Sequence, residues 1–288
     1  MDTRRIMINV MIALLPAFGV SIWQFGYKPV ILVLVSMASA VFFEWLYRRL
    51  MKKNSTIGDC SAALTGLLLA MTLPATAPWW LPVIGTFFAI VIVKQLYGGI
   101  GKNFLNPALA ARAFLVASYS LKMTSWVVPN SLTSQVDAVT MATPMTYLYS
   151  GEAMPAYLNM KSMFFGTMPG CIGEISTLAL LVGAAYLMIR KIITWRIPIS
   201  FIGTVCILNL IFGHSGYSNF EWMMYNLLSG ALMLGAFFMA TDYATTPVTP
   251  GGHILFGVGC GIITVLIRYF GSYPEGVSYS ILIMNLCA

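Results

Sequence analysis

The sequence predicts an all-α polytopic membrane protein with about ten transmembrane helices, arranged as two inverted five-helix repeats. Three observations support this fold class: the composition, the spacing of the apolar segments and an internal repeat. Hydrophobic residues make up 59% of the 288 residues and charged residues 9%, and the mean hydropathy is +0.82. The solvent of such a chain is lipid rather than water, which excludes a soluble enzyme.

The net charge of +7 does not indicate a nucleic-acid partner. The basic residues form short clusters between apolar runs, as the positive-inside rule predicts for a membrane protein. The five cysteines show no C-x-x-C spacing and the two histidines lie far apart. Neither a disulfide framework nor a protein-held metal site is therefore predicted.

Ten apolar segments are candidates for spanning helices, which need about 20 mostly apolar residues. They are residues 6–25, 29–46, 60–73, 81–96, 107–119, 175–193, 197–212, 222–240, 254–270 and 277–288. The third, fifth and tenth are short. Because the tenth cannot cross about 30 Å of hydrocarbon, we expect that the last helix is truncated and that the native polypeptide continues.

The basic residues predict the orientation of these segments. If every candidate crosses the membrane, four groups fall on one side: Arg4 and Arg5; Arg48, Arg49, Lys52 and Lys53; Lys94 and Lys102; Arg190, Lys191 and Arg196. By the positive-inside rule this side is cytoplasmic, as are both termini. The chain then divides into a first membrane repeat (1–119), an outer-face loop (120–174) and a second membrane repeat (175–288).

The two predicted repeats show weak similarity to each other. Residues 65–70 (TGLLLA) resemble residues 229–234 (SGALML), and Gly85, Tyr97 and Gly99 align with Gly257, Tyr269 and Gly271. Five helices in each copy give the copies opposite orientations, as in many transport proteins. Broken elements are expected at 98–107 and 271–276, where unpaired backbone could line a site. Two ordinary loops are the alternative.

The outer-face loop contains an unusual stretch, residues 137–144 (DAVTMATP). Its pattern Asp-x-x-(Ser/Thr)-x-Ala-Thr resembles the sequence at which a flavin transferase joins FMN through its phosphate to a threonine hydroxyl. The attachment residue would be Thr143, with Asp137, Thr140 and Ala142 completing the motif. Such a reaction is expected to need an exposed hydroxyl and small neighbours. Met141 departs from the small residue usual at its position, and an ordinary turn before Pro144 is the alternative.

Two further strings are unusual for connections between membrane helices. In residues 94–115, Asn106 is placed to cap a helix that begins at Pro107, but a capped turn leaves Asn103 and the buried Arg112 unexplained. Residues 166–176 form a glycine-rich loop before a membrane helix. This loop could offer backbone N–H groups to a phosphate, although Glu174 disfavours an anion and a structural turn is the alternative.

Together with residues 240–242 and 271–276, these strings closely resemble the D subunit of the Rnf complex, an ion-pumping ferredoxin:NAD oxidoreductase. The related B subunit of the sodium-pumping NADH:quinone oxidoreductase shares the motifs but carries an extended N-terminal segment, so the early first helix favours the Rnf side. The resemblance implies FMN esterified to Thr143 and a non-covalent riboflavin in the membrane domain, for which we choose Asn103, Asn106 and Arg112 as contacts. It also implies a prokaryotic inner membrane.

Partner subunits are implied in the same way. Electrons would pass from a second flavin-carrying subunit on the outer side through FMN to riboflavin and back toward the cytoplasmic side. The chain has no nucleotide-binding glycine fingerprint and no cysteine cluster for iron–sulfur ligation. NAD and ferredoxin must therefore bind elsewhere, iron–sulfur subunits must complete the enzyme, and a flavin transferase is needed for maturation.

Ion transport needs a polar route, and ionisable residues at membrane depth are the first candidates. These are Asp242, Glu275, Asp59 and Glu44, of which Asp242 and Glu275 rank highest because they lie at broken elements of the second repeat. The residues do not distinguish sodium from protons. A non-redox channel or carrier for a small solute is the alternative that the inverted repeat alone would allow, and a scaffold for redox partners is a third.

Overall fold

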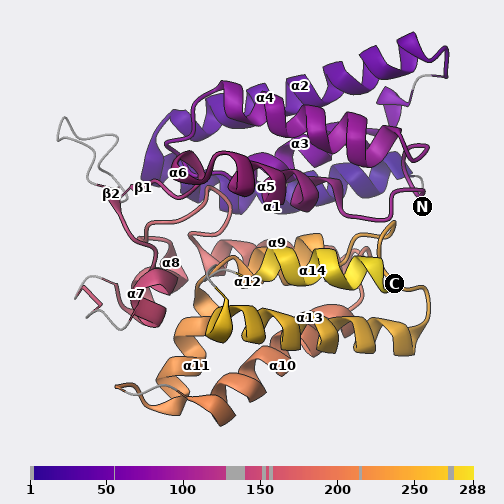
Figure 1. The fold of residues 1–288 in the computed structure, drawn as a ribbon. Helices are drawn as coiled ribbons and strands as arrows, with labels where there is room; N and C mark the ends of the chain where they lie inside the picture. The colour runs from indigo at the N-terminus through magenta and orange to yellow at the C-terminus, as the bar shows by residue number, and fades with distance from the viewer. Residues whose placement is uncertain are drawn as a thin grey trace.

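The computed structural model describes residues 3–54, 56–127, 140–150, 154–155, 158–213, 216–271 and 276–288. Asp137 and Glu275 lie outside these ranges. Figure 1 shows the first half of the chain in the upper part of the molecule and the second half in the lower part, with both chain ends at one end of the helices. The connection between the halves, which includes α7 and α8, lies at the opposite end.

The elements of the first half follow the predicted apolar segments. They are α1 (Thr3–Phe25), α2 (Lys28–Leu50), the short 3-10 helix η1 (Ile57–Asp59), α3 (Ser61–Met71), α4 (Trp80–Phe87) with its π-helical continuation η2 (Phe88–Gln95), and α5 (Pro107–Ser118). The connection contains α6 (Ser120–Met123), α7 (Pro144–Ser150), α8 (Met160–Phe165) and the antiparallel strands β1 (Trp126–Val127) and β2 (Thr140–Met141). Trp126 pairs with Met141 and Val127 with Thr140.

The second half is also helical. It contains α9 (Thr177–Ile189), α10 (Arg196–Phe212), α11 (Asn219–Leu228), α12 (Leu232–Leu234) with its π-helical continuation η3 (Gly235–Met239), α13 (Pro250–Phe270) and α14 (Val277–Leu286). In the first half α2 packs against α3 and α4, and α4 against α5. The corresponding pairs of the second half are α10 with α11 and α13, and α13 with α14.

Two pairs of helices connect the halves: α1 runs antiparallel to α9, and the start of α5 contacts the end of α14. Tyr186, near the end of α9, donates to Asn9, near the start of α1, over 2.6 Å. The backbone N–H of Asn106, just before α5, donates to Asn285 Oδ1, near the end of α14, over 3.2 Å. At the α1–α9 crossing a Cβ on Gly183 would collide with the Ala13 carbonyl, so glycine permits this close approach.

Among the described residues, three helices are long and apolar enough to cross a membrane by themselves: α1, α2 and α13. Six other predicted spans correspond to shorter apolar helices of 10–17 residues. With 11 residues, α3 is about 17 Å long, roughly half of the hydrocarbon thickness. The protein is thus a mostly helical, polytopic membrane protein, in which length alone identifies fewer complete spans than the ten expected.

The eighth predicted span, residues 222–240, is not one continuous helix. It bends by 62° between Asn219–Leu228 and Leu232–Met239, because Gly230 and Ala231 adopt left-handed backbone conformations with φ of 71° and 55°. The buried Arg268 binds the carbonyls freed at this break, with Nη1 2.8 Å from Asn226 O and Nη2 3.4 Å from both Ser229 O and Gly230 O. A cation is suited to a helix C-terminus, where carbonyl dipoles are unpaired.

Candidate functional site

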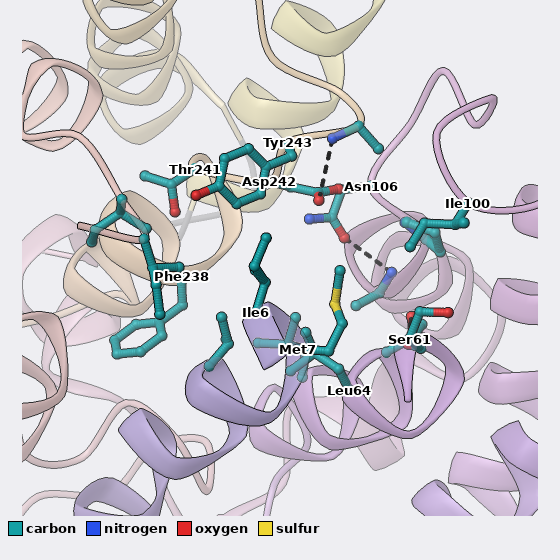
Figure 2. Close-up of a pocket in the computed structure, with 18 of the residues that line it drawn as sticks. Ile6, Met7, Ser61, Leu64, Ile100, Asn106, Phe238, Thr241, Asp242 and Tyr243 are labelled. Carbon is teal, nitrogen blue, oxygen red and sulfur yellow. Dashed lines mark hydrogen bonds between the residues drawn. The ribbon is translucent and has the colours of Figure 1, made fainter. Parts of the chain in front are cut away.

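A pocket lies between the two halves, at the end of the bundle where α1, α3 and α5 begin and η2, α9 and η3 end. It encloses about 80 Å³, enough for a few water molecules, and opens at a mouth between the two halves. Figure 2 shows apolar side chains from the first half, among them Ile6, Met7 and Leu64, below the polar segment that begins at Thr241. The polar lining consists of Ser61, Thr65, Lys94, Asn103, Asn106, Thr241 and Asp242.

Asn106 lines the pocket and also joins the two halves. Its Oδ1 accepts from the backbone N–H of Ala108 at 3.1 Å (Figure 2) and from that of Leu109 at 3.3 Å, which confirms the predicted helix cap. Its Nδ2 donates to Met239 O at 3.2 Å, at the end of η3. Most of the hydrogen-bonding capacity of this amide is therefore committed to the fold, which leaves one Nδ2 hydrogen for a ligand.

Asn103 differs from Asn106 because its side chain offers a ligand a hydrogen-bond acceptor. The side chain is buried, and its Nδ2 donates to Leu105 O at 3.1 Å. Within the described part of the chain its Oδ1 accepts no hydrogen bond. Asn103 therefore presents the pocket with an amide acceptor that local structure already holds in place.

Asp242 follows the end of η3 and lines the same pocket. Burial raises the pKa of its carboxyl, while hydrogen bonds from the Ala244 N–H and the Thr245 hydroxyl and the charge of Lys94 act in the opposite direction. The two hydrogen bonds are long, at 3.5 Å and 3.4 Å. One predicted ion-pathway residue thus belongs to the pocket shared with Asn103 and Asn106, while Glu275 lies outside the described residues.

Lys94 and Glu44 form a buried ion pair beside the pocket. Lys94 Nζ lies 3.2 Å from the Glu44 carboxylate, and the two residues are 3% and 0% exposed. Lys94, which was grouped with Lys102 among the predicted cytoplasmic basic residues, is thus buried, because its partner lies in α2 within the bundle. Gln95 Nε2 and the Thr56 hydroxyl also donate to Glu44, at 2.7 Å and 2.8 Å.

A hydrogen-bonded chain connects this ion pair to Asp59. Lys94 Nζ donates to Ser61 Oγ over 2.6 Å, and the Ser61 hydroxyl donates to Asp59 Oδ1 over 2.6 Å. Ser61 and Lys94 both line the pocket. The structure thus brings together Glu44 and Asp59, two predicted ion-pathway residues, through a lysine and a serine that the sequence alone did not single out.

Arg112 does not line this pocket, contrary to its predicted place beside Asn103 and Asn106. It is buried within α5, and Nη2 lies 3.6 Å from Cys171 Sγ. The reason is helical geometry: Arg112 follows Asn106 by six residues, about 9 Å further along the helix axis. Its guanidinium consequently faces the glycine-rich loop at 166–176.

The glycine-rich loop is a structural turn. The N–H groups of Ile172 and Gly173 donate to Leu73 O at 2.9 Å and Met71 O at 2.7 Å, at the end of α3. Donors that could have faced a phosphate therefore cap a helix C-terminus instead. Glu174 is also buried in this loop, where it would repel an anion.

Thr143 lies at the opposite end of the bundle from the pocket, directly before α7. It is only 4% exposed, which contradicts the expectation of an exposed hydroxyl. The hydroxyl shares a 3.0 Å hydrogen bond with that of Thr146 and accepts from the Thr146 N–H at 3.4 Å. The segment is buried because Met145 and Leu148 of α7 pack with Trp222 of α11.

The other members of the predicted attachment motif are less fully described. Ala142 is half-buried, and the Thr140 backbone pairs with Val127 in the short sheet. The Thr140 side chain and Asp137 lie outside the described residues.

Comparison with known proteins identifies the family. The sequence profile of the NQR2, RnfD, RnfE family matches residues 1–288. The chain belongs to this family.

The relatives in this family are components of ion-translocating oxidoreductases. The chain is 49% identical over 287 residues to the D subunit of the Na(+)-translocating ferredoxin:NAD(+) oxidoreductase complex of Acetobacterium woodii, covering 99% of this chain and 86% of that protein. It is 43% identical over 291 residues to the proton-translocating counterpart of Clostridium ljungdahlii, with coverages of 98% and 86%. Identity to the D subunit of the ion-translocating oxidoreductase complex of Escherichia coli K12 is 35% over 319 residues, with coverages of 99% and 90%.

For this member of the NQR2, RnfD, RnfE family, sequence reasoning missed Lys94 and Arg268. Lys94 was used only as one of the basic residues that predict the cytoplasmic side, and lysines at the end of an apolar run usually reach the interface. The signal that could have found it is Glu44, an acid near the end of another apolar run, which needs a buried partner. Arg268 has no comparable signal, because its acceptors include backbone carbonyls and the neutral amide oxygen of Asn226.

Proposed function

We propose that this chain is the D-type membrane subunit of an ion-translocating ferredoxin:NAD oxidoreductase complex, in which it relays electrons through bound flavins. The observation that carries the proposal is the similarity of nearly the whole chain to subunits with that name. The buried ionisable groups beside a pocket at the junction of the two halves support it, because ionisable groups at membrane depth mark ion or proton routes.

We infer that the ten apolar segments form two inverted repeats of five spans, with both termini cytoplasmic and the Thr143 segment on the outer face. The antiparallel contacts of α1 with α9 and of α5 with α14 support the inversion. The location of α7 at the end opposite both chain ends supports the sidedness (Figure 1). Residues 98–107 and 271–276 stay the proposed broken elements, which build sites near the midplane in such folds; residues 272–275 lie outside the described part of the chain.

We propose that a non-covalent flavin such as riboflavin binds at this pocket, whose mouth must widen to admit the ring. A flavin ring needs a largely apolar slot with a few fixed polar groups along one edge, and the pocket supplies Phe237, Phe238 and aliphatic side chains beside the Asn103 acceptor. Asn103 would bind an N–H of the ring and Asn106 would contribute its remaining N–H. A bound flavin supplies reversible electron acceptance, while the protein determines its position and electrostatic surroundings.

Thr143 is the proposed attachment site of FMN. In this reaction the threonine oxygen replaces a leaving group on the flavin phosphate and the hydroxyl loses its proton. The motif supports the assignment, as does the position of Thr143 at the start of α7. Because the hydroxyl is buried and hydrogen-bonded, attachment requires that α7 leaves its docked position or has not yet docked.

Flavin fluorescence after denaturation tests the covalent site. The full-length chain, produced together with a flavin transferase, is expected to fluoresce as a flavin in a denaturing gel. Thr143→Ala should abolish the band, whereas the control Thr146→Ala, which changes the hydrogen-bonding neighbour, should keep it. Wild-type chain without fluorescence would contradict the attachment and favour a non-redox carrier.

The transported ion is not decided by the relatives, since one is named for sodium and another for protons. We propose Glu44, Asp59 and Asp242 as groups on the route, with Glu275 as a further candidate. Glu44 and Asp59 are joined through Lys94 and Ser61, which places a continuous polar path beside the flavin pocket.

A further inference from the structure

Lys94 lies between the Glu44 carboxylate and the pocket, where a ligand could carry negative charge. It supplies the only cation among the described residues that line the pocket, yet its ammonium is bound to the Glu44 carboxylate on the other side. Lys94 Nζ also donates to Ser61 Oγ over 2.6 Å, and Ser61 lines the pocket. A small movement of one flexible side chain could therefore transfer a positive charge from Glu44 to a ligand in the pocket.

The other buried cations cannot take this role. Arg268 is bound to the carbonyls at the break after α11, and Arg112 faces Cys171. Lys102 is exposed to solvent, where water screens its charge. Lys94 alone combines burial, a place in the pocket wall and a carboxylate partner.

Carboxylates lie on two sides of Lys94. The Glu44 carboxylate is 3.2 Å from Nζ, and Asp59 is joined to Nζ through the Ser61 hydroxyl. Asp242 lines the same pocket as Lys94. Because an unpaired charge in this surrounding is costly, a negative charge added to the pocket must be balanced, either by Lys94 or by an incoming cation.

We propose that Lys94 is a positioning residue that exchanges partners and thereby links the charge of the pocket to cation uptake at Glu44. The proposal rests on the proposed function, because it needs a flavin in the pocket. With a neutral flavin Lys94 pairs with Glu44. When the flavin receives an electron from a reduced flavin or iron–sulfur centre of a partner subunit, Lys94 moves to it.

A cation that binds to Glu44 then replaces the positive charge of Lys94. The carboxylate that has lost its ammonium binds one Na⁺ or H⁺, so one electron and one cation enter together. When the electron leaves for the next acceptor, Lys94 returns to Glu44 and displaces the cation. Lys94 thereby couples each electron that reaches the pocket to the occupancy of a buried carboxylate.

The test is the midpoint potential of the non-covalent flavin in the full-length chain. Thr143→Ala serves as the background, so that the pocket holds the only flavin, and the protein is titrated by spectroelectrochemistry in nanodiscs at several Na⁺ concentrations and pH values. Lys94→Met should lower the potential by at least the equivalent of tenfold in the reduction equilibrium, about 59 mV for one electron. Glu44→Gln should raise it, because Lys94 loses its competing partner.

The double variant Lys94→Met/Glu44→Gln separates this exchange from a general loss of structure. It removes both buried charges, so folding should be retained, and its potential should return toward the starting value but no longer depend on Na⁺ or pH. Lys102→Met, an exposed charge at the same end of the bundle, should leave the potential unchanged.

Two results would overturn the inference. If flavin is bound but its potential is the same in Lys94→Met and Glu44→Gln, or if the double variant keeps its cation dependence, Lys94 does not exchange partners and the flavin pocket itself stands. If the Thr143→Ala chain binds no flavin at all, the proposed pocket fails, and this inference fails with it.

Discussion

At the scale of single residues, Asn103 and Asn106 lie in the same connection before α5 but have different roles. Asn106 caps α5 and binds Met239 across the two halves. Asn103 has only a local contact to Leu105. Two amides three residues apart therefore separate into one that stabilises the fold and one that is available to a ligand.

This difference predicts opposite outcomes for two alanine variants. Asn106→Ala removes a helix cap and a buried contact and should cost about 1–2 kcal/mol of unfolding free energy, measured by denaturant unfolding in detergent. Asn106→Asp should recover the cap but not the bond to Met239. Asn103→Ala should leave stability nearly unchanged while the amount of non-covalent flavin co-purified with the chain falls severalfold. Equal flavin content in Asn103→Ala and wild type would exclude Asn103 as a ligand.

Charged residues show the same dependence on context. Lys94 stands where a lysine usually reaches the membrane interface, yet Glu44, fifty residues earlier in the chain, holds it inside the bundle. Removing one partner of such a pair leaves a buried charge uncompensated, which typically costs about 3–5 kcal/mol. Single variants of this pair therefore need the double variant as their reference.

At the scale of elements, α7 links the proposed attachment site to the second half of the chain. Tyr149 donates to Asn226 Oδ1 over 2.8 Å, the residue whose carbonyl binds Arg268. Met145, one position into the helix, accepts from the Ser229 hydroxyl at the break after α11. Docking of α7 therefore buries Thr143 and contacts the break before α12 at the same time.

If docking limits access to Thr143, loosening α7 should speed flavin attachment. Tyr149→Phe removes one hydrogen bond, worth about 1 kcal/mol, so the undocked population should rise roughly fivefold. Attachment rates, followed by in-gel fluorescence at limiting transferase, should increase by a similar factor. Tyr147→Phe on the same helix is the control. A Tyr149→Phe rate equal to that of the wild type would mean that α7 docking does not limit the reaction.

At the scale of the whole molecule, the arrangement of the two halves determines where the polar groups meet. The pocket is formed by the starts of α1, α3 and α5 and the ends of η2, α9 and η3. The antiparallel contact of α1 with α9 places the start of α1 beside the end of α9. Both chain ends lie at this end of the bundle, and α7, which directly follows Thr143, lies at the other (Figure 1).

This arrangement predicts which residues can be labelled from each side of the membrane. In a chain whose other cysteines are replaced, the exposed Cys287 should react with a membrane-impermeant maleimide only in inside-out vesicles. A Lys161→Cys substitution at the exposed start of α8 should react only in right-side-out vesicles. Reaction of both positions in the same vesicle preparation would contradict the proposed topology.

The sequence by itself determined the membrane class, the ten helical regions, the cap at Asn106 and the family. Each of these depends on local signals: apolar runs, a side chain two or three residues from the N–H groups that donate to it, and motifs that are continuous in the chain. Backbone hydrogen bonds within a helix connect near neighbours, so such signals suffice. The broken eighth span was less predictable, because Ala231 adopts its left-handed conformation only within the packed bundle.

Only the tertiary structure decided how the polar groups combine. The Lys94–Glu44 pair joins residues 50 positions apart, Arg268 reaches carbonyls about 40 residues earlier, and Thr143 is buried by a helix that docks on α11. In lipid each of these groups must find a partner within the protein. Which helix supplies the partner depends on how the helices pack in the assembled bundle, and the sequence of one segment does not determine it.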